Sequence, residues 1–220
     1  MTAADVLKPA GFPGRPARLA GRLPAGIWLS WLHLRTRRVP AGIVALAVCG
    51  VLLRVVLHWK SSSDPQQFPL IVEAGAAAVI AVTTHGPFGE VERATGRRLP
   101  FLRLLAAVGM CGLAILALQL GVVGESLNDG ILVLARNVIG LAGLGLACSL
   151  VTGGLLAWVL PLGYMAFCQY ALTEAWSAPW TWPTRPPADR GGWIAAMTVL
   201  AVALLAYTLR GPRIRPSDNA

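Results

Sequence analysis

Three ionisable residues lie inside long apolar runs of the sequence: Arg54, Glu73 and Arg136. A charged side chain near the middle of a membrane costs at least about 2.5 kcal/mol on insertion scales, so each is expected to have a partner. Each lies about five residues from the outward end of its run, which is on the order of 8 Å along a helix. We therefore expect an intramembrane charged cluster of these three residues. Within it, Arg54 and Glu73 are expected to form an ion pair, with Arg136 as a second cation.

Three interpretations of this cluster are open. The first, which we favour, is an ion pair that fixes how the helices pack. The second is a polar patch in an outward-facing cavity that handles an anionic or amphiphilic substrate. The third is that the long side chains extend to the outer headgroups, which the shallow depth permits.

The composition defines the class of protein. Of the 220 residues, 55% are hydrophobic and only 13% are charged, whereas soluble domains carry about 25% charged residues. The chain is therefore predicted to be an all-α, polytopic membrane helix bundle, with the lipid bilayer as its first partner. Its net charge of +9 suits loops held against an anionic leaflet. Nucleic acid is not expected as a partner, because the sequence has no basic, aromatic-rich soluble domain.

Six apolar runs predict six transmembrane helices, since about 20 residues cross the roughly 30 Å of hydrocarbon. They cover residues 42–59, 68–84, 101–123, 131–151, 155–173 and 192–209. Pro161 is expected to kink the fifth helix. The runs belong to one transmembrane domain, residues 26–209.

The ends of the chain are polar and basic. Residues 1–25 are rich in Pro, Gly, Ala and Arg and predict a flexible basic cytoplasmic tail. Residues 26–38 place Trp and Leu on one side of a helix and Arg on the other, which predicts an amphipathic helix lying in the membrane interface. Residues 210–220 form a cytoplasmic C-terminal tail.

Basic residues predict the orientation of the bundle. With six spans and both termini in the cytoplasm, 14 of the 19 Lys and Arg residues lie inside. Only Lys60, Arg185 and Arg190 lie outside. Loops rich in Lys and Arg stay on the cytoplasmic side. We therefore expect a multi-pass protein of the plasma membrane with its N-terminus and C-terminus in the cytoplasm.

Small residues recur at the four-residue spacing that lets membrane helices approach closely. The pairs are Ala74/Ala78, Ala77/Ala81, Gly143/Ala147 and Gly145/Ser149. They predict a tightly packed bundle and say little about function.

Catalytic and metal-binding motifs are missing from the sequence. No HExxH, GxSxG, Walker A or GxGxxG motif stands in a credible context. The four cysteines lie in apolar runs with no CxxC spacing. We expect no enzyme activity, no metal site and no cofactor.

The layout resembles the permease subunits of ABC-2-type transporters. The residues that carry the resemblance are the interfacial segment 26–38, the segment Phe88–Leu99 between spans two and three, and the aromatic segment Trp176–Trp193 before span six. The excess of arginine over lysine and the richness in Ala, Gly and Leu are also similar to membrane proteins of high-GC actinobacteria.

This resemblance implies a membrane subunit that forms a homodimer or heterodimer and works with a separate ATP-binding cassette subunit. It implies that the first cytoplasmic loop docks the ATPase. Here that docking loop would be Phe88, Glu90, Val91, Glu92 and Arg93. The loops of this chain are shorter than those of a typical member. The alternative is a non-transporting accessory, immunity or assembly protein of the membrane. The substrate and the direction of transport are not encoded in any motif.

Overall fold

A computed structural model describes residues 39–59, 67–84, 99–124, 130–174, 176 and 178–210. Every regular element in these ranges is helical, which confirms the all-α prediction. The α-helices are α2 (Val39–Trp59), α3 (Gln67–Thr84), α5 (Leu99–Val122), α6 (Gly130–Thr152), α7 (Val159–Thr173) and α8 (Arg190–Arg210). Two short 3-10 helices, η1 (Gly154–Leu156) and η2 (Trp182–Thr184), precede α7 and α8. The predicted tail 1–25, the interfacial helix 26–38 and the segment 211–220 lie outside the described residues.

The six helices begin and end close to the six predicted runs. Five stretches of the described chain are long and apolar enough to cross a membrane, η1 and α7 together making one of them. Helix α3 has 18 residues and is apolar over Pro69–Thr84 as well. The agreement follows from local chemistry, because an apolar run buried in lipid must satisfy its own backbone and therefore forms a helix.

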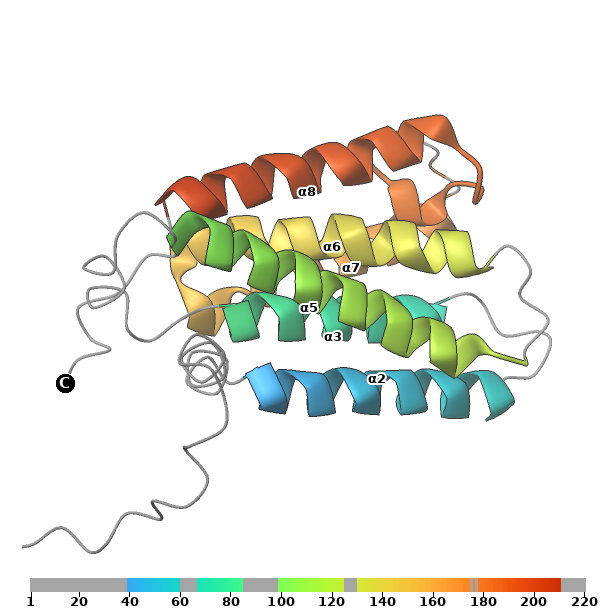
Figure 1. Cartoon of the computed structure of the whole chain (residues 1–220). Coiled ribbons are helices and arrows are strands. Elements are labelled where there is room, and N and C mark those ends of the chain that lie inside the picture. Colours follow the sequence, from blue (N-terminus) through green and yellow to red (C-terminus); the bar gives the residue numbers. More distant parts are fainter. Residues whose placement is uncertain are drawn as a thin grey trace, which may run out of the picture.

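Helix α6 lies at the centre of the bundle and packs against α3, α5, α7 and α8. Figure 1 shows α8 on one side of the bundle and α2 on the other, with α5 crossing obliquely between them. Helix α2 packs against α3 and α5. Many apolar side chains of α2, α5 and α8 point away from the bundle, among them Val51, Leu120 and Val202. An outward apolar surface of this kind suits a lipid environment.

Glycines allow α2 and α5 to touch along their backbones. A Cβ added to Gly50 would overlap the carbonyl oxygen of Ala117, and one added to Gly121 would overlap the carbonyl oxygen of Gly50. Close approach of this kind supplies the van der Waals contact that drives helix association in lipid. The small-residue pairs found in the sequence do not include this contact.

Two of the predicted small-residue pairs do mediate packing of α6. A Cβ on Gly143 would lie 2.8 Å from the backbone of Leu200 in α8. A Cβ on Gly145 would lie 2.8 Å from Cβ of Ala81 in α3. The small-xxx-small spacing therefore marks the two faces of α6 that meet α8 and α3.

The chain breaks between α6 and α7 instead of kinking within α7. Gly153 takes a φ of 84°, a left-handed conformation that glycine adopts without steric cost. The 3-10 turn η1 follows directly. Pro161 is the third residue of α7, in the first turn, where its missing N–H leaves no helical hydrogen bond unmade. The kink expected at Pro161 is therefore wrong, because the break comes before the helix starts.

Candidate functional site

Helix α6 carries two polar residues, Arg136 and Asn137, into the interior of the bundle. The side chain of Arg136 is 0% exposed, and Asn137 is also buried. The Nη1 atom of Arg136 donates to the carbonyl oxygen of Pro186 at 2.7 Å, and Nη2 donates to that of Arg185 at 2.8 Å. Arg136 therefore pairs with backbone carbonyls of the connection between α7 and α8, not with a carboxylate.

Residues 178–189, which we call the cap segment, fold against the end of the bundle where α6 begins. The hydroxyl groups of two threonines stabilise its turns by hydrogen bonds to backbone carbonyl oxygens. Thr181 Oγ1 donates to the carbonyl oxygen of Ala178 at 2.8 Å, and Thr184 Oγ1 donates to that of Thr181 at 2.8 Å. Indole Nε1 of Trp193 in α8 donates to the carbonyl oxygen of Pro187 at 3.0 Å. These bonds satisfy backbone groups that the loop would otherwise leave unpaired.

Asp189 joins the cap segment to α8. Its Oδ2 accepts from the backbone N–H of Gly192 at 2.6 Å, three residues on, as the carboxylate of an N-cap residue does. Its carboxylate also pairs with Arg185, with 2.8 Å between Nε and Oδ2. The Gly192 hydrogen bond and the Arg185 guanidinium lower the pKa of Asp189 below its usual value.

Trp182 anchors the cap segment in the bundle. Its side chain is 3% exposed and stacks on the ring of Tyr164 in α7, with ring centroids 4.5 Å apart. The indole lies over Gly140 of α6, where an added Cβ would be 2.7 Å from Nε1. Tyr164 donates its hydroxyl to the carbonyl oxygen of Trp180. The absence of a side chain at Gly140 makes the notch that receives Trp182.

Glu73 lies on α3, opposite Asn137 of α6, and its side chain is 4% exposed. Its Oε2 accepts from Nδ2 of Asn137 at 2.9 Å. Arg136 acts on Glu73 through its charge, but no Lys or Arg of the described residues forms an ion pair with Glu73. The structure thus brings Glu73 and Arg136 into one polar cluster and adds Asn137.

Arg54 does not join this cluster. It lies on an exposed face of α2, and Nη1 donates to the carbonyl oxygen of Val123, at the end of α5, at 3.3 Å. The ion pair expected between Arg54 and Glu73 is not formed. Arg54 is on an exposed side of its helix, whereas Glu73 is buried against α6.

The residues Phe88, Glu90, Val91, Glu92 and Arg93, expected to dock an ATPase, lie outside the described residues. So does the whole connection from α3 to α5, residues 85–98. Two residues of the polar cluster were missed from the sequence, Asn137 and Trp182. The signal for Asn137 was present, because it is a second polar residue directly after Arg136 in an apolar run. Nothing in the sequence pairs Trp182 with Gly140.

The described residues contain no group of three His, Cys, Asp or Glu side chains that could hold a metal ion. The cluster offers a carboxyl group, an amide and a guanidinium in a buried setting. Such groups can fix helix packing, bind a polar solute or hold water.

The expected effect of acid on the cap segment follows from Asp189. Because its pKa is lowered on folding, its contribution to stability is complete above the unfolded value of about 3.9 and is lost as pH falls through the folded pKa. Asp189→Asn should make cleavage of residues 178–189 by an acid-tolerant protease faster at neutral pH. The difference in cleavage rate between Asp189→Asn and the unchanged protein should disappear at pH values below the folded pKa of Asp189. A difference that persists unchanged at low pH would contradict this role.

Long apolar helices packed around a buried polar cluster define the chain as a multi-span helical membrane protein. Comparison of the chain with protein-family models, with curated proteins and with solved structures finds no match.

Proposed function

We propose that this chain is a membrane-spanning, permease-like subunit of an ABC-type exporter and works with a separate ATPase subunit. The observation that carries the proposal is the cap segment. It is an aromatic, folded connection between the last two helices, as in the layout that the sequence resembles. The order of the six helices supports the same layout. In this proposal the chain has no enzyme activity of its own, and the ATPase supplies the energy.

We also propose that α3 crosses the membrane, so that the chain has six spans with both termini in the cytoplasm. Helix α3 lies beside α2, α5 and α6 (Figure 1), and its 18 residues fall in the usual length range of a transmembrane helix. The strong excess of Lys and Arg on one side of a six-span arrangement supports this orientation.

Reporter fusions test the orientation. Fusions after Arg98 and after Arg215 should report the cytoplasm, because basic segments are retained there. Fusions near Ser62 and Pro186 should report the outside. A C-terminus found outside would contradict six spans, whereas the fold of the bundle would still stand.

The ATPase interaction is expected at the loop between α3 and α5. In this proposal Phe88 and Val91 are apolar anchors of a short helix, and Glu90, Glu92 and Arg93 surround them. Apolar anchors supply most of the affinity of a helix in a groove, and charges at the rim mainly set the association rate. Phe88→Ala combined with Val91→Ala should therefore abolish co-purification of the ATPase and leave membrane insertion intact.

A matched control lies in another connection. Val151, in the last turn of α6, and Leu155, in η1, are exposed apolar residues at the end of the bundle where α3 ends and α5 begins (Figure 1). Val151→Ala with Leu155→Ala should leave the complex intact. If the complex survives the change at Phe88 and Val91 as well, the docking role is wrong.

The second candidate is a non-transporting accessory, immunity or assembly protein. One observation favours it: Glu73 and Arg136 are already engaged by Asn137 and by the cap segment, as groups that only stabilise the fold would be. A gene for an ATP-binding cassette subunit next to this one would favour the permease, and the lack of one would favour the accessory protein.

A further inference from the structure

Three buried polar atoms near the cap segment have no hydrogen-bond partner among the described residues. They are Nε of Arg136, Oδ1 of Asn137 and Nε1 of Trp182. All three residues are more than nine-tenths buried. An unpaired polar atom in such a place costs about 1–3 kcal/mol, and nearly all such atoms in native proteins are paired with protein or with ordered water.

The three atoms come from one sector of the bundle. A helix turns about 100° per residue. If Arg136 defines the origin, Gly140 lies at roughly 40° and Asn137 at about 100°, so that Gly140 points between them. The Trp182 ring fills the space over Gly140, with Nε1 2.7 Å from the position of an added Cβ. All three residues are therefore placed within one turn of α6.

An apolar layer bounds this sector toward the opposite end of the bundle. Ala77 lies one turn beyond Glu73 on α3, and Leu141 lies one turn beyond Asn137 on α6. Both are fully buried and pack in one cluster with Cys168 of α7. On this side of the polar atoms the bundle interior is therefore apolar.

We propose that the sector between α6 and the cap segment, next to Glu73 of α3, is a binding site for ordered water. The water accepts hydrogen bonds from Nε of Arg136 and Nε1 of Trp182 and donates one to Oδ1 of Asn137. Two donors and one acceptor suit water, which both accepts and donates, and buried waters make about three hydrogen bonds. An anion cannot accept from Oδ1, and a metal cation cannot pair with the two N–H groups.

Glu73 borders this site through its hydrogen bond with Asn137. Water bound in this site therefore lies near the buried carboxyl group of Glu73, on the side of the cap segment. The site does not depend on whether the chain is a permease, because it rests only on the described contacts.

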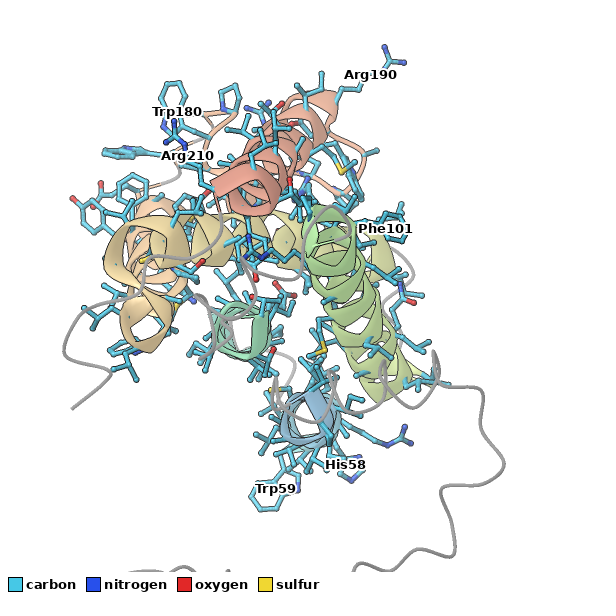
Figure 2. The ribbon with its side chains drawn as sticks, turned by 60° about the vertical axis from the view of Figure 1, so that its left-hand side comes forward. His58, Trp59, Phe101, Trp180, Arg190 and Arg210 are labelled. Carbon is cyan, nitrogen blue, oxygen red and sulfur yellow. The ribbon has the colours of Figure 1, made fainter. Side chains whose placement is uncertain are left out.

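Hydroxyl-radical labelling by X-ray radiolysis of the full-length protein in nanodiscs tests the site, with mass spectrometry as the readout. X-rays generate hydroxyl radicals from water wherever it is bound, so the water in this site should label Trp182 although that residue is 3% exposed. After rapid mixing into ¹⁸O-water, the oxygen added to Trp182 should become ¹⁸O more slowly than the oxygen added to Trp180. Trp180 is 66% exposed and points out of the bundle (Figure 2). Tyr207 is 1% exposed and donates to the carbonyl oxygen of Thr84; it should stay unlabelled.

Two results would overturn the proposal. If Trp182 stays unlabelled like Tyr207, the sector is dry. If its label exchanges as fast as that of Trp180, the cap segment opens to bulk solvent and holds no bound water. These measurements use the unchanged protein and do not depend on any variant folding.

A substitution locates the water. Asn137→Leu keeps the branched shape of the side chain and removes the acceptor, so labelling of Trp182 should fall several-fold. Ser149→Ala, farther along α6, should leave it unchanged, since Ser149 bonds only within its own helix among the described residues. Unchanged labelling of Trp182 in Asn137→Leu would show that Asn137 does not hold the water.

Discussion

Replacing Arg136 with Met should release the cap segment and lower the free energy of unfolding by about 3–5 kcal/mol, the usual cost of removing one partner from a buried charged network. Methionine fills much of the volume but donates no hydrogen bond. The carbonyl oxygens of Arg185 and Pro186 would lose their donors, and the carboxyl of Glu73 would lose the nearby positive charge. Chemical unfolding in detergent measures the loss, and limited proteolysis of residues 178–189 reports the release.

Arg54→Met is the matched control for this change. Arg54 is an exposed arginine of another helix and makes one hydrogen bond at 3.3 Å, so its replacement should cost no more than about 0.5 kcal/mol. Arg136→Lys should fall between the two, because lysine keeps the charge but lacks the planar fork that reaches both carbonyls. If Arg136→Met is as stable and as resistant to protease as Arg54→Met, the cap segment is held by other contacts.

The second large effect is expected at the contact between α2 and α5. Gly121→Ala should destabilise the bundle by about 1–3 kcal/mol, the usual cost of overpacking. The new methyl would overlap the carbonyl oxygen of Gly50, a backbone atom that cannot rotate away, so the two helices must separate. Disulfide trapping of cysteines placed along α2 and α5, together with thermal unfolding, measures the separation.

Gly112→Ala on the same helix is the control. A Cβ at Gly112 has nothing within 4 Å, so this change should be neutral or should stabilise α5 by up to about 1 kcal/mol through helix propensity. Equal effects of the two changes would mean that helix propensity, and not the contact with Gly50, governs the response at Gly121.

The two effects act on different parts of the molecule. Arg136 connects the segment between α7 and α8 to the central helix α6, whereas Gly121 sets the distance between α2 and α5. Because the sites are in different contacts, the losses in the double variant should be close to additive.

The class of protein and the positions of the helices could be predicted from the amino-acid sequence. Length and hydropathy are local properties, so the apolar runs locate the six helices to within a few residues. The rule that a charge inside such a run needs a partner picked out Glu73 and Arg136 as buried residues, and the small-xxx-small spacing picked out Gly143 and Gly145 as contact residues.

Which groups contact one another depends on how the helices pack together. The position of a residue along a helix sets its depth at about 1.5 Å per residue, so Arg54 and Glu73 could be placed at one level from the sequence. The direction of a side chain around the helix axis depends on which neighbours pack against that helix. Because of that direction, Arg54 lies on the outside and donates a hydrogen bond to Val123, whereas Glu73 accepts one from Asn137. Arg136 pairs with carbonyl groups, which every residue carries, so no pattern of side chains could have revealed its partner.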